Sequence, residues 1–111
     1  MYFKYLAERE PDKQVIQHEK GFAIYSFVTF GEEMAVYIED IYVEKPHRKS
    51  HVASELSEQV QSHAIEKGCG VMLGTVAPSA VGSSVSMKVL LSHGMQLLKS
   101  EPDLIWFYKE L

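Results

Sequence analysis

The residues best suited to chemistry lie where a predicted strand runs into a basic loop. The strand covers residues 34–43 and carries two adjacent carboxylates, Glu39 and Asp40. The loop at 47–49 holds a histidine, an arginine and a lysine, and it opens a predicted helix. Free backbone N–H groups and the positive dipole end at such a helix start favour an anion, most naturally a phosphate. A solvated helix cap beside two solvent-exposed carboxylates fits the same pattern.

The elements that position this loop are predicted by apolar periodicity. Apolar residues recur every fourth position from Val52 to Ala64, which predicts an amphipathic helix from about residue 51 to 67 that Gly68 ends. Before the loop, three segments read as an antiparallel meander of strands. They are residues 14–19, 22–30 and 34–43, and a short amphipathic helix is expected ahead of them at 2–10.

The C-terminal half alternates between strands and helices. A short apolar strand is predicted at 71–76, followed by a helix at 83–93 that Gly94 ends. Two further strands are expected at 95–99 and 104–110, on either side of a turn. The order of these elements predicts one α+β, or mixed α/β, domain that spans residues 1–111.

Composition excludes several classes of protein. The chain has 111 residues, 46% of them hydrophobic, and a formal charge of -4 without a Lys/Arg-rich block, which argues against nucleic-acid binding. No segment approaches the roughly 20 apolar residues of a membrane span. The single cysteine, Cys69, is expected to be a small, semi-buried residue in a cytoplasmic protein. His47 and His51 lack a fixed acidic or cysteine ligand nearby, so no metal site is expected.

The residues around the basic loop resemble the GCN5-related N-acetyltransferase (GNAT) family. In that family an "I-E-D-I-Y-V" strand, a proline-containing link and Arg-x-x-Gly-x-Gly/Ala at a helix start form the acetyl-CoA-binding signature. Here the signature reads Arg48-Lys49-Ser50-His51-Val52-Ala53, and the later elements follow the family order. The resemblance implies a GNAT-like fold, a central, mostly antiparallel sheet with helices packed on it, shortened at the N-terminus.

The resemblance also implies a role for each part of the site. Acetyl-CoA would be the acetyl donor and a primary amine the acceptor. Glu39 would take a proton from the amine, because a protonated amine cannot attack a thioester. Asp40 is the second candidate, and strict alternation along a strand would let only one of the two face the cleft. The residues expected to hold the cofactor are Ile41, Tyr42, Val43, Arg48, Lys49, Ser50, His51, Val52, Ala53, Ser83 and Ser84.

Two residues depart from the family pattern. His51 stands at the first motif glycine, where glycine easily adopts a positive φ. Leu90 stands where many relatives have a tyrosine that protonates the leaving thiolate, and leucine cannot donate a proton. Elements that usually build the acceptor pocket are also missing before residue 11. A catalytically inactive GNAT-like binding or assembly module is therefore the alternative, and a homo-oligomer is expected if a partner subunit completes the pocket.

Overall fold

A computed structural model describes residues 12–44, 46, 51–79 and 83–111 of the chain. The strands are β1 (Lys13–His18), β2 (Gly21–Phe30), β3 (Glu33–Val43), β4 (Val71–Val76), β5 (Gln96–Glu101) and β6 (Leu104–Glu110). The helices are α2 (Val52–Glu66) and α3 (Ser83–Ser92). The helix expected at residues 2–10 lies outside the described residues.

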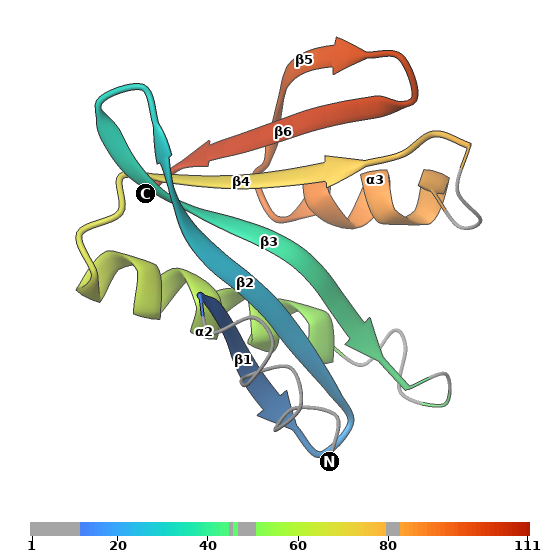
Figure 1. Ribbon diagram of the computed structural model, residues 1–111. Coiled ribbons are helices and arrows are strands. Elements are labelled where there is room, and N and C mark those ends of the chain that lie inside the picture. The colour runs from blue at the N-terminus through green and yellow to red at the C-terminus, as the bar shows by residue number, and fades with distance from the viewer. Residues whose placement is uncertain (1–11, 45, 47–50, 80–82) are drawn as a thin grey trace.

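The strands form one six-stranded sheet in the order β1-β2-β3-β4-β6-β5 (Figure 1). Only β3 and β4 pair in parallel, and α2 connects them, as a parallel crossover requires. All other neighbours pair antiparallel, including the predicted meander of β1, β2 and β3. The expected α+β fold with a mostly antiparallel sheet is thus confirmed.

Both helices end at the glycines predicted from the sequence, Gly68 for α2 and Gly94 for α3. Gly68 has φ +87°, and the backbone N–H of Cys69 behind it donates to the Ala64 carbonyl at 2.9 Å. Gly94 has φ +84° and is followed by a bond from the Met95 N–H to the Leu90 carbonyl. These are the left-handed glycine endings that satisfy the last carbonyls of a helix.

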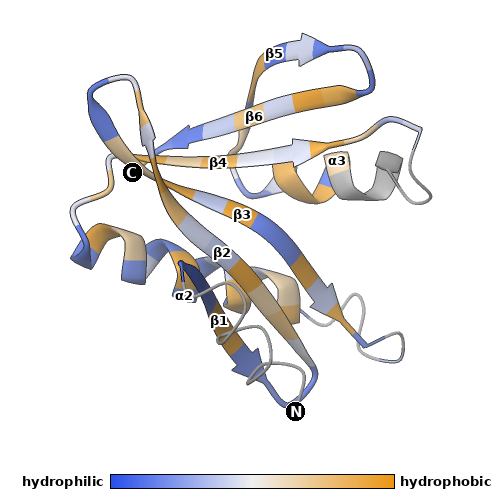
Figure 2. Cartoon of the chain, viewed as in Figure 1, coloured by the Kyte–Doolittle hydropathy of each residue, from blue (hydrophilic) through white to orange (hydrophobic). Residues whose placement is uncertain are grey.

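The main core lies between the sheet and α2. Leu56, Val60 and Ala64 are fully buried, in agreement with the predicted four-residue periodicity. They pack with buried residues of β2, β3, β4 and β6, among them Tyr25 and Phe107. Figure 2 shows hydrophobic residues at the beginning of β6 and hydrophilic residues at both ends of β1, the outermost strand. Cys69 also belongs to this core, and burial raises the pKa of its thiol, as expected for a structural cysteine.

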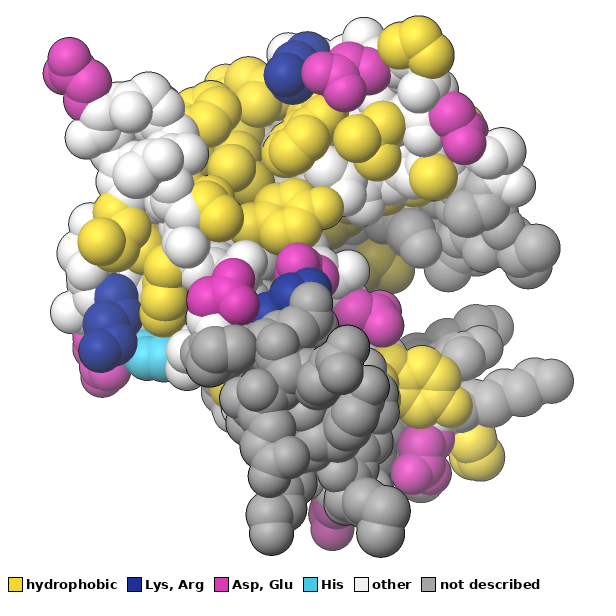
Figure 3. Space-filling model, in the orientation of Figure 1, with side chains coloured by type: hydrophobic (Ala, Val, Ile, Leu, Met, Phe, Trp, Pro, Cys, Tyr) yellow, Lys and Arg dark blue, Asp and Glu magenta, His cyan; other side chains and the backbone are white. Residues whose placement is uncertain are grey.

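The opposite face of the sheet carries a second apolar cluster. Ala35, Val71 and Leu73 are buried there, and partly buried aromatic residues such as Phe30 and Tyr108 surround them. Neither α2 nor α3 covers this face, and hydrophobic side chains gather on it in Figure 3. Within the described part of the chain, neither helix is long and apolar enough to cross a membrane.

Candidate functional site

The two parallel strands part in the middle of the sheet. β3 and β4 are paired from Ala35 opposite Val71 to Ile38 opposite Gly74. Beyond these pairs β3 continues to Val43, still bonded to β2, and β4 continues to Val76, still bonded to β6. Figure 1 shows the two strands diverging there, and the space-filling view is hollowed on the same side (Figure 3). The described part of β3 beyond Ile38 therefore presents a backbone edge that β4 does not pair.

A β-bulge marks the point of divergence. Tyr25 of β2 lies opposite Ile38 of β3, and Ile24 lies opposite Asp40, so Glu39 is the extra residue on β3. The core pattern shifts accordingly, because Ile38 and then Ile41 pack toward α2. Glu39 and Asp40 both lie in exposed positions between them. The bulge breaks the strict alternation on which the expectation of a single carboxylate facing the opening rested, and which of the two faces it stays a prediction.

Glu39 is paired with a lysine that the sequence analysis did not single out. Lys13 Nζ lies 2.7 Å from Glu39 Oε2, and the two side chains are 22% and 24% exposed. Lys13 starts β1 and is in register with Ser26 of β2, so its side chain reaches across β2 toward β3. No local pattern could have predicted this contact, because it depends on the register of three strands.

Hydroxyl groups lie on the same side of the parting strands as Glu39. The Tyr37 hydroxyl and Thr75 Oγ1 are 2.7 Å apart, and they join β3 to β4 beside the last backbone pairs. Tyr37 also contacts the Trp106 ring, with 5.9 Å between ring centroids. Tyr37 and Glu39 are two positions apart on β3, and both lie on the face away from α2. This face therefore brings a carboxylate, an ammonium group and two hydroxyls close to the opening.

The residue that precedes α2 has an unusual backbone conformation. His51 precedes the helix with φ +66° and ψ +10°, in the left-handed region that glycine adopts most readily. Within the described residues no side chain caps the helix, and the backbone N–H of Glu55 donates to the His51 carbonyl. The backbone N–H groups of Val52 and Ala53 are thus available to an anion. Arg48, Lys49 and Ser50 of the predicted signature lie outside the described residues.

An acidic residue in the first turn of α2 disfavours anion binding at this end of the helix. Glu55 lies in the first turn of α2, and its carboxylate accepts a hydrogen bond from His18 Nε2 at 3.1 Å. His18 Nδ1 itself accepts the Lys20 backbone N–H, so the ring proton must be on Nε2. The histidine therefore donates from Nε2 and orients the Glu55 carboxylate toward β1.

Leu90, the predicted departure in α3, is a packing residue. Its Cδ2 atom lies 3.6 Å from the position that a Cβ atom on Gly74 would occupy. Gly74 ends the β3–β4 pairing, so Leu90 covers the start of the opening from the helix side. Ser83 and Ser84 begin α3, although the placement of their side chains lies outside the described residues.

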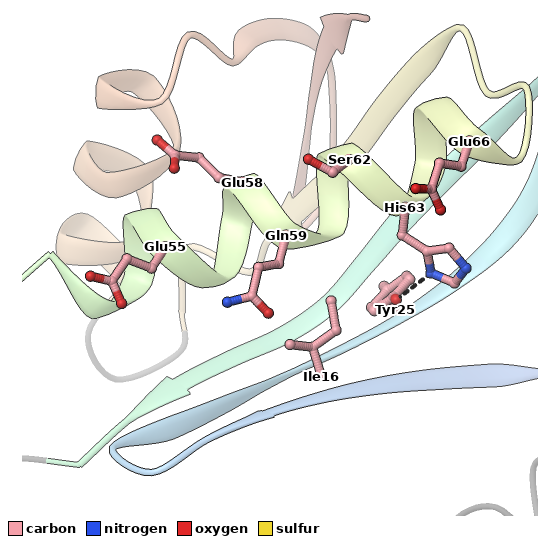
Figure 4. A pocket seen from close by; sticks show the side chains of 8 residues that line it. All are labelled: Ile16, Tyr25, Glu55, Glu58, Gln59, Ser62, His63 and Glu66. Atoms are coloured by element: carbon pink, nitrogen blue, oxygen red, sulfur yellow. Dashed lines mark hydrogen bonds between the residues drawn. The ribbon is translucent and has the colours of Figure 1, made fainter.

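A separate groove of about 590 Å³ runs along α2 on the side of β1 (Figure 4). The Tyr25 hydroxyl and His63 Nδ1, 2.6 Å apart, lie at one end of it, and burial raises the pKa of the phenol. The groove is lined by Ile16, Tyr25, Glu55, Glu58, Gln59, Ser62, His63 and Glu66. It contains none of the predicted site residues, so it is distinct from the opening between β3 and β4.

Comparisons with known proteins agree with this geometry. The family model described as the acetyltransferase (GNAT) family matches residues 6–83. No curated protein matches the chain.

Three solved structures illustrate the shared fold. A candidate streptothricin acetyltransferase of Bacillus anthracis, in complex with acetyl coenzyme A, is 19% identical with a TM-score of 0.73; the match covers 100% of this chain and 68% of that one. NAA60 of Arabidopsis thaliana, with a bisubstrate analogue, is 14% identical with a TM-score of 0.75, covering 98% and 81%. Naa50 of Arabidopsis thaliana, with the bisubstrate analogue CoA-Ac-MVNAL, is 17% identical with a TM-score of 0.67, covering 83% and 66%.

At these identities the solved structures show the fold, and the family model shows the family. The predicted resemblance and the predicted fold are both confirmed. The parting of β3 and β4, followed by the crossover helix that begins at His51, lies within the matched region. The chain belongs to the acetyltransferase (GNAT) family.

Proposed function

We propose that the chain is an N-acetyltransferase that uses acetyl-CoA to acetylate a primary amine by direct attack on the thioester. The observation that carries the proposal is the parting of β3 from β4 at Ile38 and Gly74, together with the start of α2, the helix that connects these two strands. The Bacillus anthracis relative, which has the same fold, is bound to acetyl coenzyme A. Bound acetyl-CoA would supply an activated acetyl group.

The residues described here fit such a cofactor. β4 does not pair with β3 beyond Ile38, so an extended chain that carries amides would lie beside Ile41, Tyr42 and Val43. The N–H groups of Val52 and Ala53 and the positive end of α2 suit a pyrophosphate. Glu55 in the first turn weakens that field, and His51 presents an imidazole at the same end of the helix.

Glu39 is the proposed base. Its carboxylate lies on the bulge where β3 leaves β4, and it already contacts an ammonium group at 2.7 Å. A carboxylate in this position can take a proton from an ammonium group, and the resulting neutral amine can attack the thioester. Asp40 follows on the same face and is the second candidate.

A binding module without catalysis is the second proposed function. Two observations favour it: Leu90 fills its position with a side chain that cannot donate a proton, and His51 holds the left-handed conformation without a glycine. Such a module would bind coenzyme A without releasing a thiol.

Thiol release from acetyl-CoA distinguishes the two functions. We expect release that depends on an added amine and falls about a hundredfold to ten-thousandfold in Glu39→Gln. The matched control is Glu33→Gln, which changes a carboxylate at the other end of β3, and it should retain the wild-type rate. Binding should be measured separately, as the melting shift with acetyl-CoA and with coenzyme A.

Each outcome of these measurements has a definite meaning. A melting shift without amine-dependent thiol release would favour the binding module. The absence of a shift at millimolar cofactor would contradict both functions.

A further inference from the structure

We propose that Lys13 is an acetylation site of this same chain, modified by its own active site. This inference rests on the proposed function. Lys13 Nζ lies 2.7 Å from Glu39 Oε2, in the position relative to the base that an acceptor amine must take. The structure therefore already holds a primary amine against the proposed base.

The contact between Lys13 and Glu39 joins two strands that are not neighbours in the sheet. Lys13 is on β1 and Glu39 on β3, with β2 between them, so the two side chains together span two strand spacings of about 5 Å each. Lys13 alternates with Ile16 and His18, which face α2, and so it projects to the opposite side of the sheet. This is the side on which the bulge places Glu39.

Other described lysines have different surroundings. Lys99 pairs with Glu101 at 3.1 Å, and both side chains are about half exposed. Lys109 Nζ donates to the amide oxygen of Gln61 at 3.2 Å, in a partly buried contact without a carboxylate. Among the lysines in the described part of the chain, Lys13 is the one that forms a salt bridge with Glu39.

The proposed step balances without any further reactant. The Lys13 ammonium loses one proton to Glu39, and its nitrogen then forms a bond to the thioester carbonyl carbon. The carbon–sulfur bond breaks, and the electron pair leaves with the sulfur of coenzyme A, which takes up a proton as the free thiol. The products are an uncharged acetyl-lysine, coenzyme A and one proton released to solvent. Loss of the ammonium charge also removes the ion pair from Glu39.

The test is to incubate the purified full chain with acetyl-CoA alone, without added amine, and to map acetylated peptides by mass spectrometry over time. We expect one acetyl group on Lys13, at a rate per molecule that does not change with protein concentration. Lys13→Arg should abolish the modification, and Glu39→Gln should slow it about a hundredfold. Lys109→Arg is the matched control and should leave Lys13 modification unchanged.

Three results would overturn the proposal. They are acetylation of Lys13 no faster than in the denatured chain, acetylation unaffected by Glu39→Gln, and a rate proportional to protein concentration. Thiol release with an added amine, measured on the same sample, separates this proposal from the proposed function. If that release occurs while Lys13 stays unmodified, only the self-acetylation fails. If neither occurs, the proposed transferase activity fails with it.

Discussion

The Tyr37 hydroxyl and Thr75 Oγ1 lie 2.7 Å apart and connect β3 to β4 where the two strands begin to separate. Backbone pairing ends at Ile38 and Gly74, one residue after Tyr37 on β3 and one residue before Thr75 on β4. Beyond that pair no backbone bond joins the two strands, so the hydrogen bond between the Tyr37 and Thr75 side chains holds them together where the separation begins. Both residues lie on the face of the sheet that carries Glu39, so the geometry of the opening and the position of the proposed base are linked.

Tyr37→Phe should reduce the unfolding free energy by about 1 kcal/mol, the usual contribution of one hydrogen bond. Thr75→Val should have a similar effect, because it removes the other half of the same bond. The double variant should lose less than the sum of the two single losses, since the bond can be lost only once. Urea unfolding of the four proteins measures this coupling. Fully additive losses would show that the hydroxyls do not stabilise each other.

His51→Gly should stabilise the chain and strengthen its binding of coenzyme A. His51 has φ +66°, and a residue with a Cβ atom in that conformation costs roughly 1 kcal/mol more than glycine. For a chain of this size, that gain raises Tm by about 4–8 °C. Calorimetric titration with coenzyme A measures the affinity of each variant.

His51→Ala is the control for this prediction. Alanine keeps the backbone strain and removes the imidazole. Tighter binding in the glycine variant alone would attribute the effect to the backbone, and equal tightening in both would attribute it to crowding by the ring. Weaker binding in both variants would show instead that the imidazole contributes to the anion site.

The helix after the basic loop could be predicted closely from sequence because its signals are local. Apolar residues at every fourth position define the buried face of α2, and Gly68 ends it through a backbone conformation that few other residues adopt. The expected helix at 51–67 is observed at Val52–Glu66. The family signature could be read for the same reason, since it lies in one continuous segment.

The bulge at Glu39 could not be predicted in this way. It contains neither glycine nor proline, and only the change in apolar spacing from Ile38 to Ile41 hints at it. The ion pair between Lys13 and Glu39 leaves no sequence signal at all, because it depends on the pairing of β1, β2 and β3. Local patterns thus predicted the elements and the candidate anion site, whereas the immediate surroundings of the proposed base follow from strand register.

Asp103→Asn should make the free energy of unfolding less dependent on pH in acid. Asp103 accepts hydrogen bonds from the Ser79 hydroxyl at 2.6 Å and from the Ser79 backbone N–H at 3.0 Å. These bonds, the hydroxyl first, hold the pKa of the carboxyl below its usual range. A carboxyl whose pKa is lower in the folded state stabilises fully above its unfolded pKa of about 4, and that contribution disappears as the pH falls through the folded value.

Urea unfolding at pH 7 and at several values below pH 4 measures this effect. Asparagine tolerates the positive φ of Asp103, +57°, so the backbone is not strained by the change. Ser79→Ala is the control: it removes the hydroxyl donor and should weaken the chain at pH 7 with little effect in strong acid. An Asp103→Asn variant with the wild-type acid profile would disprove the assignment.

Gly74 allows a further test of the opening, because it is the last β4 residue that pairs with β3. A Cβ atom at this position would lie 3.5 Å from Met95 Cε and 3.6 Å from Leu90 Cδ2, which are ordinary contacts, so Gly74→Ala should fold with nearly unchanged stability. Gly74→Val adds two more methyl groups to the same packed space and should cost about 1–3 kcal/mol.

The two variants should also differ in cofactor binding, measured as the melting shift with coenzyme A. The valine side chain lies where β3 and β4 part, so it should reduce the shift beyond its effect on stability, whereas alanine should preserve most of it. The comparison is made between shifts relative to each variant's own Tm, which removes the stability difference. An unchanged shift in Gly74→Val would place the cofactor away from this end of the opening, and the amide-bearing chain proposed to lie along β3 would then have to begin nearer to Val43.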